Sequence, residues 1–166
     1  MIFQREDFSP TVAKESWRQY PAYSNPEFET NIGSCAIKGN SKTRLVDTGL
    51  EKLDHGIDQP VRETLLSELD AFNIIPNDID IVFLTHLHMD HVGTSMVKDN
   101  GVWKPTFPNA RYIVGKSDWE MFSGLLNKPT FKYLKEHIQP LLSNGTLDFF
   151  EGKGRHYGRH RQKFIS

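Results

Sequence analysis

The sequence predicts an α/β fold, and three observations support that class. Strands are expected at residues 31–38 and 42–47, and residues 79–84 form a β-branched, aromatic run of strand length. Apolar residues at helical spacing lie between the second and the third of these segments. Strand patterns that alternate with helical patterns are typical of a sheet with helices packed against it.

The first helix is expected to begin near Asp58-Gln59-Pro60, because proline suits the first turn of a helix. The apolar side chains that follow recur on one helix face, at Val61, Leu65, Leu69 and Phe72. We expect this stripe to pack into the core and not to bind a ligand.

The third strand segment, residues 79–84, follows a turn cluster at 76–78. Its side chains are mostly large and apolar on both faces, which predicts a largely buried strand. The backbone at the end of such a strand is held by its ladder, while the residues that follow are free to curl. Any side chains placed directly after residue 84 can therefore converge.

The second half of the chain continues the alternation. Residues 111–114 are expected to form a strand. Ser117 and Glu120 then form a capping-box pattern, which predicts that a helix opens at Ser117 and runs to about Leu126.

A further helix is expected at about 130–142, and residues 146–150 are expected to form a last short strand. The helix carries a second apolar stripe, at Phe131, Leu134, Ile138 and Leu141. Pro140 should kink or shorten this helix, because proline lacks the amide hydrogen that a helix interior needs.

Composition describes an ordinary globular chain. It has 166 residues, 37% of them hydrophobic, and a formal net charge of -1, which is enough for one core and gives no sign of nucleic-acid or membrane binding. Charges at residues 5–7 interrupt what a signal peptide would need as an apolar stretch, so a cytoplasmic location is expected. Cys35 is the single cysteine and is read as a small strand residue, not as a nucleophile.

The densest chemical signal follows residue 84 directly, in the segment Thr-His-Leu-His-Met-Asp-His-Val-Gly at 85–93. It places four side chains close together, His86, His88, Asp90 and His91. Imidazole and carboxylate are ligands that suit zinc and its neighbours, and such a cluster can leave a coordination position open to water. We expect His86 and His88 to converge on one point, and Asp90 and His91 on a second point close by.

The alternative to a metal site is a fully solvated loop. Single histidines are more often hydrogen-bonded core residues than ligands, and pairs are often surface residues. Three histidines with an interleaved aspartate at a strand end favour the metal site, because burying so many polar groups without a metal or a dense hydrogen-bond network would be costly.

Residues 85–93 resemble the HxHxDH signature of the metallo-β-lactamase fold superfamily. The segment Leu-Val-Asp-Thr-Gly at 45–49 is similar to the strand end that precedes this signature, and the resemblance implies that Asp47 supports the metal loop without binding the metal. Residues 105–112 and 117–120 resemble the branch that contains lactonases and organophosphate hydrolases. The likeness covers residues 31–151, and it implies one half of an αβ/βα sandwich.

The resemblance also divides the chain into an N-terminal arm at 1–30, the family-like portion at 31–151 and a basic tail at 152–166. The arm is expected to be irregular and proline-rich. The tail is expected to be disordered or translated out of frame; an anion-binding or nucleic-acid-binding tail, or extra metal ligands from His156 and His160, is the alternative.

The family supplies a further histidine, a bridging aspartate and a final histidine from the second half of its domain, and none is recognised after residue 150. His55 and His137 are expected at the surface. The chain is therefore expected to be a truncated, N-terminal half of such a hydrolase, with impaired activity. Strand faces that would meet the other half are expected to be exposed and to favour self-association.

For the complete domain, the resemblance implies two zinc ions, or other divalent metals, and attack by a metal-bound hydroxide on a lactone, ester or phosphotriester. The metals would be bound by His86, His88, Asp90 and His91. Asp90 would also orient the attacking water or accept its proton. The expected partner is a small-molecule substrate, with no nucleic acid and no membrane. A nuclease of the same superfamily, or a non-catalytic metal-binding module, is the alternative.

Overall fold

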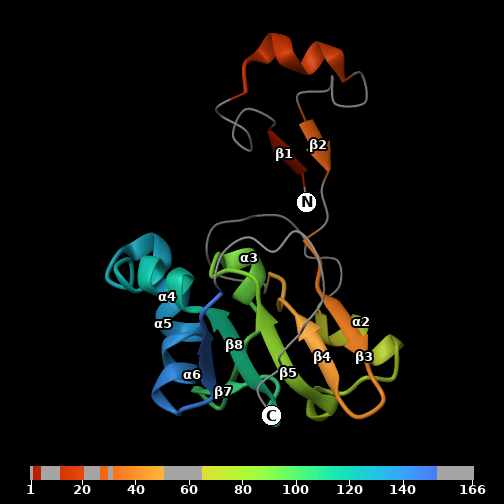
Figure 1. Ribbon diagram of the computed structural model, residues 1–166, viewed down its shortest axis with the longest axis vertical. Helices are drawn as coiled ribbons and strands as arrows, with labels where there is room; N and C mark the ends of the chain where they lie inside the picture. Colours follow the sequence, from red (N-terminus) through yellow and green to blue (C-terminus); the bar gives the residue numbers. More distant parts are fainter. Residues whose placement is uncertain (1, 5–11, 21–26, 30–31, 51–64, 153–166) are drawn as a thin grey trace.

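A computed structural model of the chain describes residues 2–4, 12–20, 27–29, 32–50 and 65–152 (Figure 1). Within the first 30 residues, β1 (Ile2–Gln4) pairs antiparallel with β2 (Glu27–Glu29), and a 3-10 helix, η1, spans Lys14–Gln19. The described parts of the arm, which was expected to be irregular, thus form a short two-stranded sheet and a 3-10 helix. The tail at 153–166 lies outside the described residues, and so do its histidines, His156 and His160. His55 lies outside them as well.

The centre of the fold is a sheet of five strands in the order β3-β4-β5-β8-β9. β3 is antiparallel to β4, and the other neighbours in the sheet are parallel. The strands are β3 (Cys35–Lys38), β4 (Thr43–Val46), β5 (Ile79–Leu84), β8 (Arg111–Gly115) and β9 (Leu147–Phe150). Each was expected from the sequence within a few residues of these bounds, and the α/β class is confirmed.

The two faces of the sheet differ in burial, because side chains alternate along a strand. Leu45, Val82 and Tyr112 are paired neighbours on one face, and all three are inaccessible to solvent. This face forms a single core with the buried side chains of the helices, among them Leu69, Phe122, Leu134 and Leu141. Full burial of a large apolar side chain stabilises a fold by about 1.5–3 kcal/mol, so each of these core residues contributes to the stability of the fold.

The opposite face is also apolar but less covered. Its central positions are half-buried, at Val46, Ile81, Phe83 and Ile113. At its edges Ile37 is 47% exposed and Phe150 is 37% exposed. The rings of Phe83 and Phe150 meet with centroids 5.4 Å apart. Among the described residues, the helices contribute their buried side chains to the other face.

The helix before β5 confirms part of the expected stripe and corrects the rest. α2 spans Leu65–Ala71, with Leu69 buried, while Val61 lies outside the described residues. The prediction that Phe72 belongs to the core was wrong, since its side chain is 77% exposed. Asn73 adopts a left-handed conformation (φ 55°) that ends the helix, and Ile74 takes the buried position instead.

The helix after β8 begins earlier than the capping pattern predicted. α4 spans Lys116–Ser123, and Gly115, the last residue of β8, occupies the N-cap without a side-chain hydrogen bond. The strand runs directly into the helix, so Ser117 already lies in the first turn. The capping-box prediction for Ser117 and Glu120 was therefore wrong, although the helix exists.

The last helical region is divided as Pro140 predicted. A 3-10 helix, η4 (Pro129–Phe131), leads into α5 (Lys132–His137), and α6 (Gln139–Ser143) follows with proline in its first turn. The surface expectation for His137 was wrong, because its side chain is fully buried. Trp103 covers it, with the two rings edge to face and 5.1 Å between centroids.

Trp103 belongs to a hairpin that the sequence patterns did not predict. β6 (Met96–Asp99) and β7 (Val102–Pro105) pair antiparallel and are joined by Asn100 and Gly101, both with positive φ. Among the described residues, no helix combines the length and apolar character needed to cross a bilayer.

Candidate metal centre

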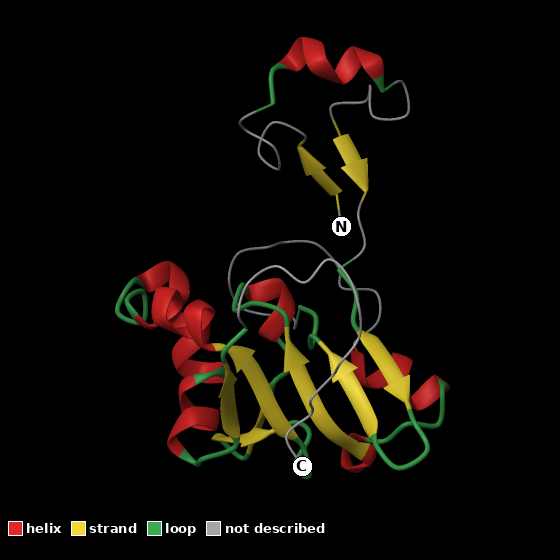
Figure 2. Cartoon of the chain, viewed as in Figure 1, coloured by secondary structure: helices red, strands yellow, loops and turns green. Residues whose placement is uncertain are grey.

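The sequence-predicted site residues gather where β4 and β5 end. Parallel neighbours finish at the same edge of a sheet, so Asp47, which follows β4, comes beside Thr85, which follows β5. The short helix α3 (Met89–Val92) lies at this same end and carries Asp90 and His91 (Figure 1). Figure 2 shows the loop that joins the end of β5 to α3 above the edge of the sheet.

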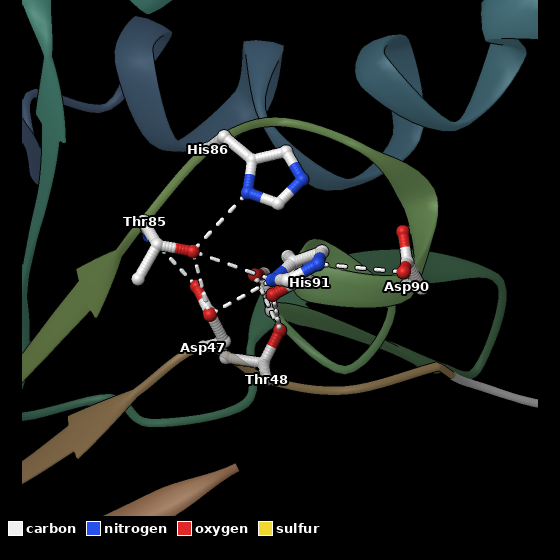
Figure 3. Close-up of polar contacts among 7 residues, drawn as sticks. Asp47, Thr48, Thr85, His86, Asp90 and His91 are labelled. Atoms are coloured by element: carbon white, nitrogen blue, oxygen red, sulfur yellow. Dashed lines mark hydrogen bonds and ion pairs between the residues drawn. The ribbon is translucent and has the colours of Figure 1, made fainter. Parts of the chain in front are cut away.

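Asp47 is the hub of the polar contacts at this edge. Its carboxylate accepts hydrogen bonds from the Thr85 amide (2.7 Å) and the Thr85 hydroxyl (2.7 Å), and it lies 2.8 Å from Nδ1 of His91 (Figure 3). The residue is 6% exposed and adopts φ 56°, a left-handed conformation that aspartate tolerates better than most residues. Its amide still continues the ladder by donating to the Phe83 carbonyl.

A second set of bonds ties the segment after Asp47 to α3. The Thr48 amide donates to the His91 carbonyl at 2.7 Å, and the Thr48 hydroxyl reaches the same carbonyl at 3.2 Å. The Gly93 amide donates to the Gly49 carbonyl at 2.8 Å. The two sequence motifs, at 45–49 and 85–93, are therefore one hydrogen-bonded unit, held together over more than 40 residues of chain.

The structure brings together His86, Asp90 and His91. One potential ligand atom from each lies within 4.8 Å of the others. The rings of His86 and His91 are adjacent, with centroids 3.7 Å apart, and His91 Nε2 lies 3.3 Å from an Asp90 carboxylate oxygen (Figure 3).

This grouping differs from the expected one, which paired His86 with His88 and Asp90 with His91. His88 lies outside the three-residue group, and its exposed ring meets the edge of His86 with centroids 4.8 Å apart. Its other neighbour is Phe122 of α4, at 5.0 Å. The difference arises because α3 begins at Met89. His91 lies in the helical turn, where its ring contacts His86, whereas His88 precedes the helix at the N-cap.

The electrostatics favour neutral imidazole at the centre of the group. The pKa of His86 lies below its ordinary value, because partial burial disfavours the charged ring and because His91 and then His88 repel an added proton. The carboxylates of Asp90 and Asp47 oppose this shift with smaller effects. Neutral imidazole is the form that binds a metal.

The donor set fits a divalent metal ion. Two imidazoles and a carboxylate are three protein ligands, as in catalytic zinc sites that keep one position open. The partners of the rings also fit: Nδ1 of His91 faces Asp47 and Nδ1 of His86 faces the Thr85 hydroxyl, which leaves both Nε2 atoms available.

Sequence reasoning missed several residues that contact this loop. Thr48 and Thr85 stood inside recognised motifs but were given no role, and their hydroxyls now bond His91 and Asp47. Tyr133 comes from a distant helix and donates to the Leu87 carbonyl, and Asp118 of another helix lies near the Leu87 amide. Such contacts depend on how α4 and α5 pack, which no local pattern reports.

Comparison with known proteins gives the following. The chain resembles the dizinc quorum-quenching lactonase AidC (22% identity, TM-score 0.65), covering 95% of this chain and 57% of that one. It also resembles the hydrolase AbOPH of the beta lactamase superfamily (24%, TM-score 0.61), covering 87% of this chain and 51% of that one. A probable metal-dependent hydrolase from Staphylococcus aureus is similar (24%, TM-score 0.62), covering 85% and 52%.

At these identities the three structures show a shared fold, and the chain spans just over half of their length. No curated protein sequence matches the chain. The family model described as the metallo-beta-lactamase superfamily matches residues 34–160. The chain therefore belongs to the metallo-beta-lactamase superfamily, as its fold and its motifs indicated.

Proposed function

We propose that the protein is a metal-dependent hydrolase that cuts lactone, ester or phosphotriester bonds. The observation that carries this proposal is the group of His86, Asp90 and His91 at the carboxyl end of β5, with Asp47 behind it. A group of this composition suits metal-assisted attack by water and offers no side-chain nucleophile of its own.

Zinc is the proposed metal, with two ions in a complete domain and other divalent metals as alternatives. A bound divalent ion would lower the pKa of a coordinated water toward about 7 and so provide a nucleophile at neutral pH. His86 and His91 would hold the ion through Nε2. We propose that His88, whose ring borders His86, joins them as a ligand.

Asp90 has two proposed roles in the reaction. Its carboxylate faces the ring of His91 and is partly exposed, so it can bind metal and also accept a proton from the attacking water. Asp47 cannot do the same, because both its oxygens already accept bonds from Thr85 and one lies against His91. We therefore assign Asp47 a positioning role.

The substrate class rests on likeness. One structural neighbour is a lactonase and another is named a hydrolase, and residues 105–112 and 117–120 resemble the lactonase and organophosphate hydrolase branch. The described residues bring three ligands into one group, which suffices for one ion but not for two. We therefore expect this chain to hold one ion and not two, and to turn over substrate slowly.

A hydrolysis panel tests the proposal. The zinc-loaded chain is assayed against a lactone, a carboxylic ester and a phosphotriester, beside Asp90→Asn and the matched control Asp99→Asn, an exposed carboxylate on β6. Hydrolysis that survives in Asp99→Asn and is lost in Asp90→Asn supports the proposal. Metal uptake without turnover of any of the three would instead favour a non-catalytic metal-binding module.

A further inference from the structure

Leu87 separates His86 from His88, and its surroundings are unusual for a loop residue. Its side chain is fully buried in the core below the sheet edge. Its carbonyl accepts a hydrogen bond from Tyr133, and the carboxylate of Asp118 lies near its amide. His86 and His88 are the direct neighbours of Leu87 in the chain. Contacts that fix the Leu87 backbone therefore also restrict the positions of both imidazole rings.

The first contact comes from α5. The hydroxyl of Tyr133, a residue only 3% exposed, donates to the Leu87 carbonyl at 3.0 Å. Burial raises the pKa of this hydroxyl, and the carboxylates of Asp90 and Asp118 raise it further. The group therefore stays protonated and acts as a donor at any physiological pH.

The second contact comes from α4. Burial raises the pKa of the Asp118 carboxyl, while His86, the Leu87 amide and His88 oppose that shift, so the carboxylate lies beside all three groups. Phe122, one turn further along α4 on the same face, packs against the ring of His88. α4 thus touches the metal loop at two points, one polar and one aromatic.

Asp118 also has a polar atom whose burial destabilises the fold. Its Oδ2 atom is buried and has no hydrogen-bond partner among the described residues. A buried, unpartnered carboxylate oxygen is destabilising, so an aspartate at this place is better explained by the loop it holds than by the stability of α4.

We propose that Asp118 and Tyr133 are positioning residues that clamp the Leu87 peptide from both sides and thereby hold His86 and His88 ready for metal. The role of the clamp in metal binding rests on the proposed function, but the contacts to Leu87 are present in the metal-free chain. Asp47 holds Thr85 and His91 from the edge of the sheet, and the clamp holds Leu87 from the helices. The loop is therefore positioned from both layers.

The first test needs no metal. Amide hydrogen exchange is measured by NMR in the metal-free chain for Tyr133→Phe, Asp118→Ala and the control Tyr112→Phe. Tyr112 is a matched buried tyrosine whose hydroxyl donates to the Ser95 carbonyl at 3.0 Å, away from Leu87. We expect exchange at residues 86–90 to rise about tenfold in the first two variants while β5 is unchanged, and no such rise in Tyr112→Phe.

The second test uses cobalt(II) as the probe, by its visible absorption and its dissociation constant. We expect Tyr133→Phe and Asp118→Ala to weaken cobalt binding about tenfold and to alter the absorption band. Asp118→Asn should recover part of the loss, since its side-chain oxygen can still lie beside the Leu87 amide.

The outcomes separate the two proposals. Unchanged exchange at 86–90 in both variants would overturn the clamp, whatever the metal data show. Failure of the unsubstituted chain to bind cobalt would overturn the proposed function, and exchange would still decide the clamp. A loss of affinity equal to that of Tyr112→Phe would also count against the clamp, since it would reflect general stability alone.

Discussion

The Asp47 carboxylate lies 2.8 Å from Nδ1 of His91, across 44 residues of sequence. This contact settles which ring nitrogen remains for a metal, because a carboxylate accepts a hydrogen bond and so requires the proton on Nδ1. Nε2 is left as an acceptor and faces the side of Asp90. Asp47, which is not one of the proposed ligands, thus determines which nitrogen of His91 is available to a metal.

Replacing Asp47 tests this relationship. Asparagine tolerates the left-handed backbone at this position but has one acceptor oxygen where aspartate has two, so Asp47→Asn cannot satisfy both Thr85 and His91. We expect zinc affinity to fall by about 10- to 100-fold, measured by competition with a chromophoric chelator. An affinity within twofold of the unsubstituted chain would contradict the role assigned to Asp47.

Thr85 offers a test with a built-in control. Thr85→Val removes the hydroxyl that donates to Asp47 at 2.7 Å, whereas Thr85→Ser keeps it. We expect the valine variant to lose about 1–2 kcal/mol in the free energy of unfolding, since it leaves a carboxylate oxygen short of a donor. Urea denaturation provides the measurement, and equal losses in the two variants would show that the hydroxyl is unimportant.

The pH response of His86 follows from its neighbours. Its pKa in the folded, metal-free chain should lie below 6.5, so the unfolded chain binds more protons between the two values. Its contribution to stability is therefore complete above pH 6.5 and declines as the pH falls through the window below that value. NMR titration of the ring should show His91→Asn raising this pKa more than His88→Asn, and a midpoint at or above 6.5 before substitution would contradict the account.

The less covered sheet face predicts self-association between copies of the chain. Ile37 of the edge strand β3 is 47% exposed on this face, and a lysine there would place a charge on the apolar surface that two copies would share. We expect Ile37→Lys to lower the average mass seen in sedimentation. Val97→Lys, at a 39% exposed position on the separate β6–β7 sheet, should not. Equal masses for both variants would place the contact elsewhere.

Local patterns predicted most of the central fold. β5 was found residue for residue, because a β-branched run bounded by a turn has few other readings. The break near Ile138 followed from Pro140. The β6–β7 hairpin was not predicted although Asn100-Gly101 favours a two-residue hairpin turn, because its strands are only four residues long and mix apolar with charged residues and proline.

Packing decided what the patterns could not. Periodicity placed Phe72 in the core because it cannot show where a helix ends, and Asn73 turns the chain before that position is reached. His137 was expected at the surface because nothing in its own neighbourhood predicts that Trp103 lies over it. The division of the four site residues likewise depended on where α3 begins.

Zinc retention is the measurement that tests the central claim most directly. The chain is loaded with zinc, dialysed, and analysed for metal in a Cys35→Ser background, because Cys35 is a free, exposed thiol that could bind zinc on its own. We predict that this background protein retains zinc and that His86→Ala and His91→Ala lose it. Equal zinc in all three proteins, or none in any, would contradict a metal centre built on these side chains.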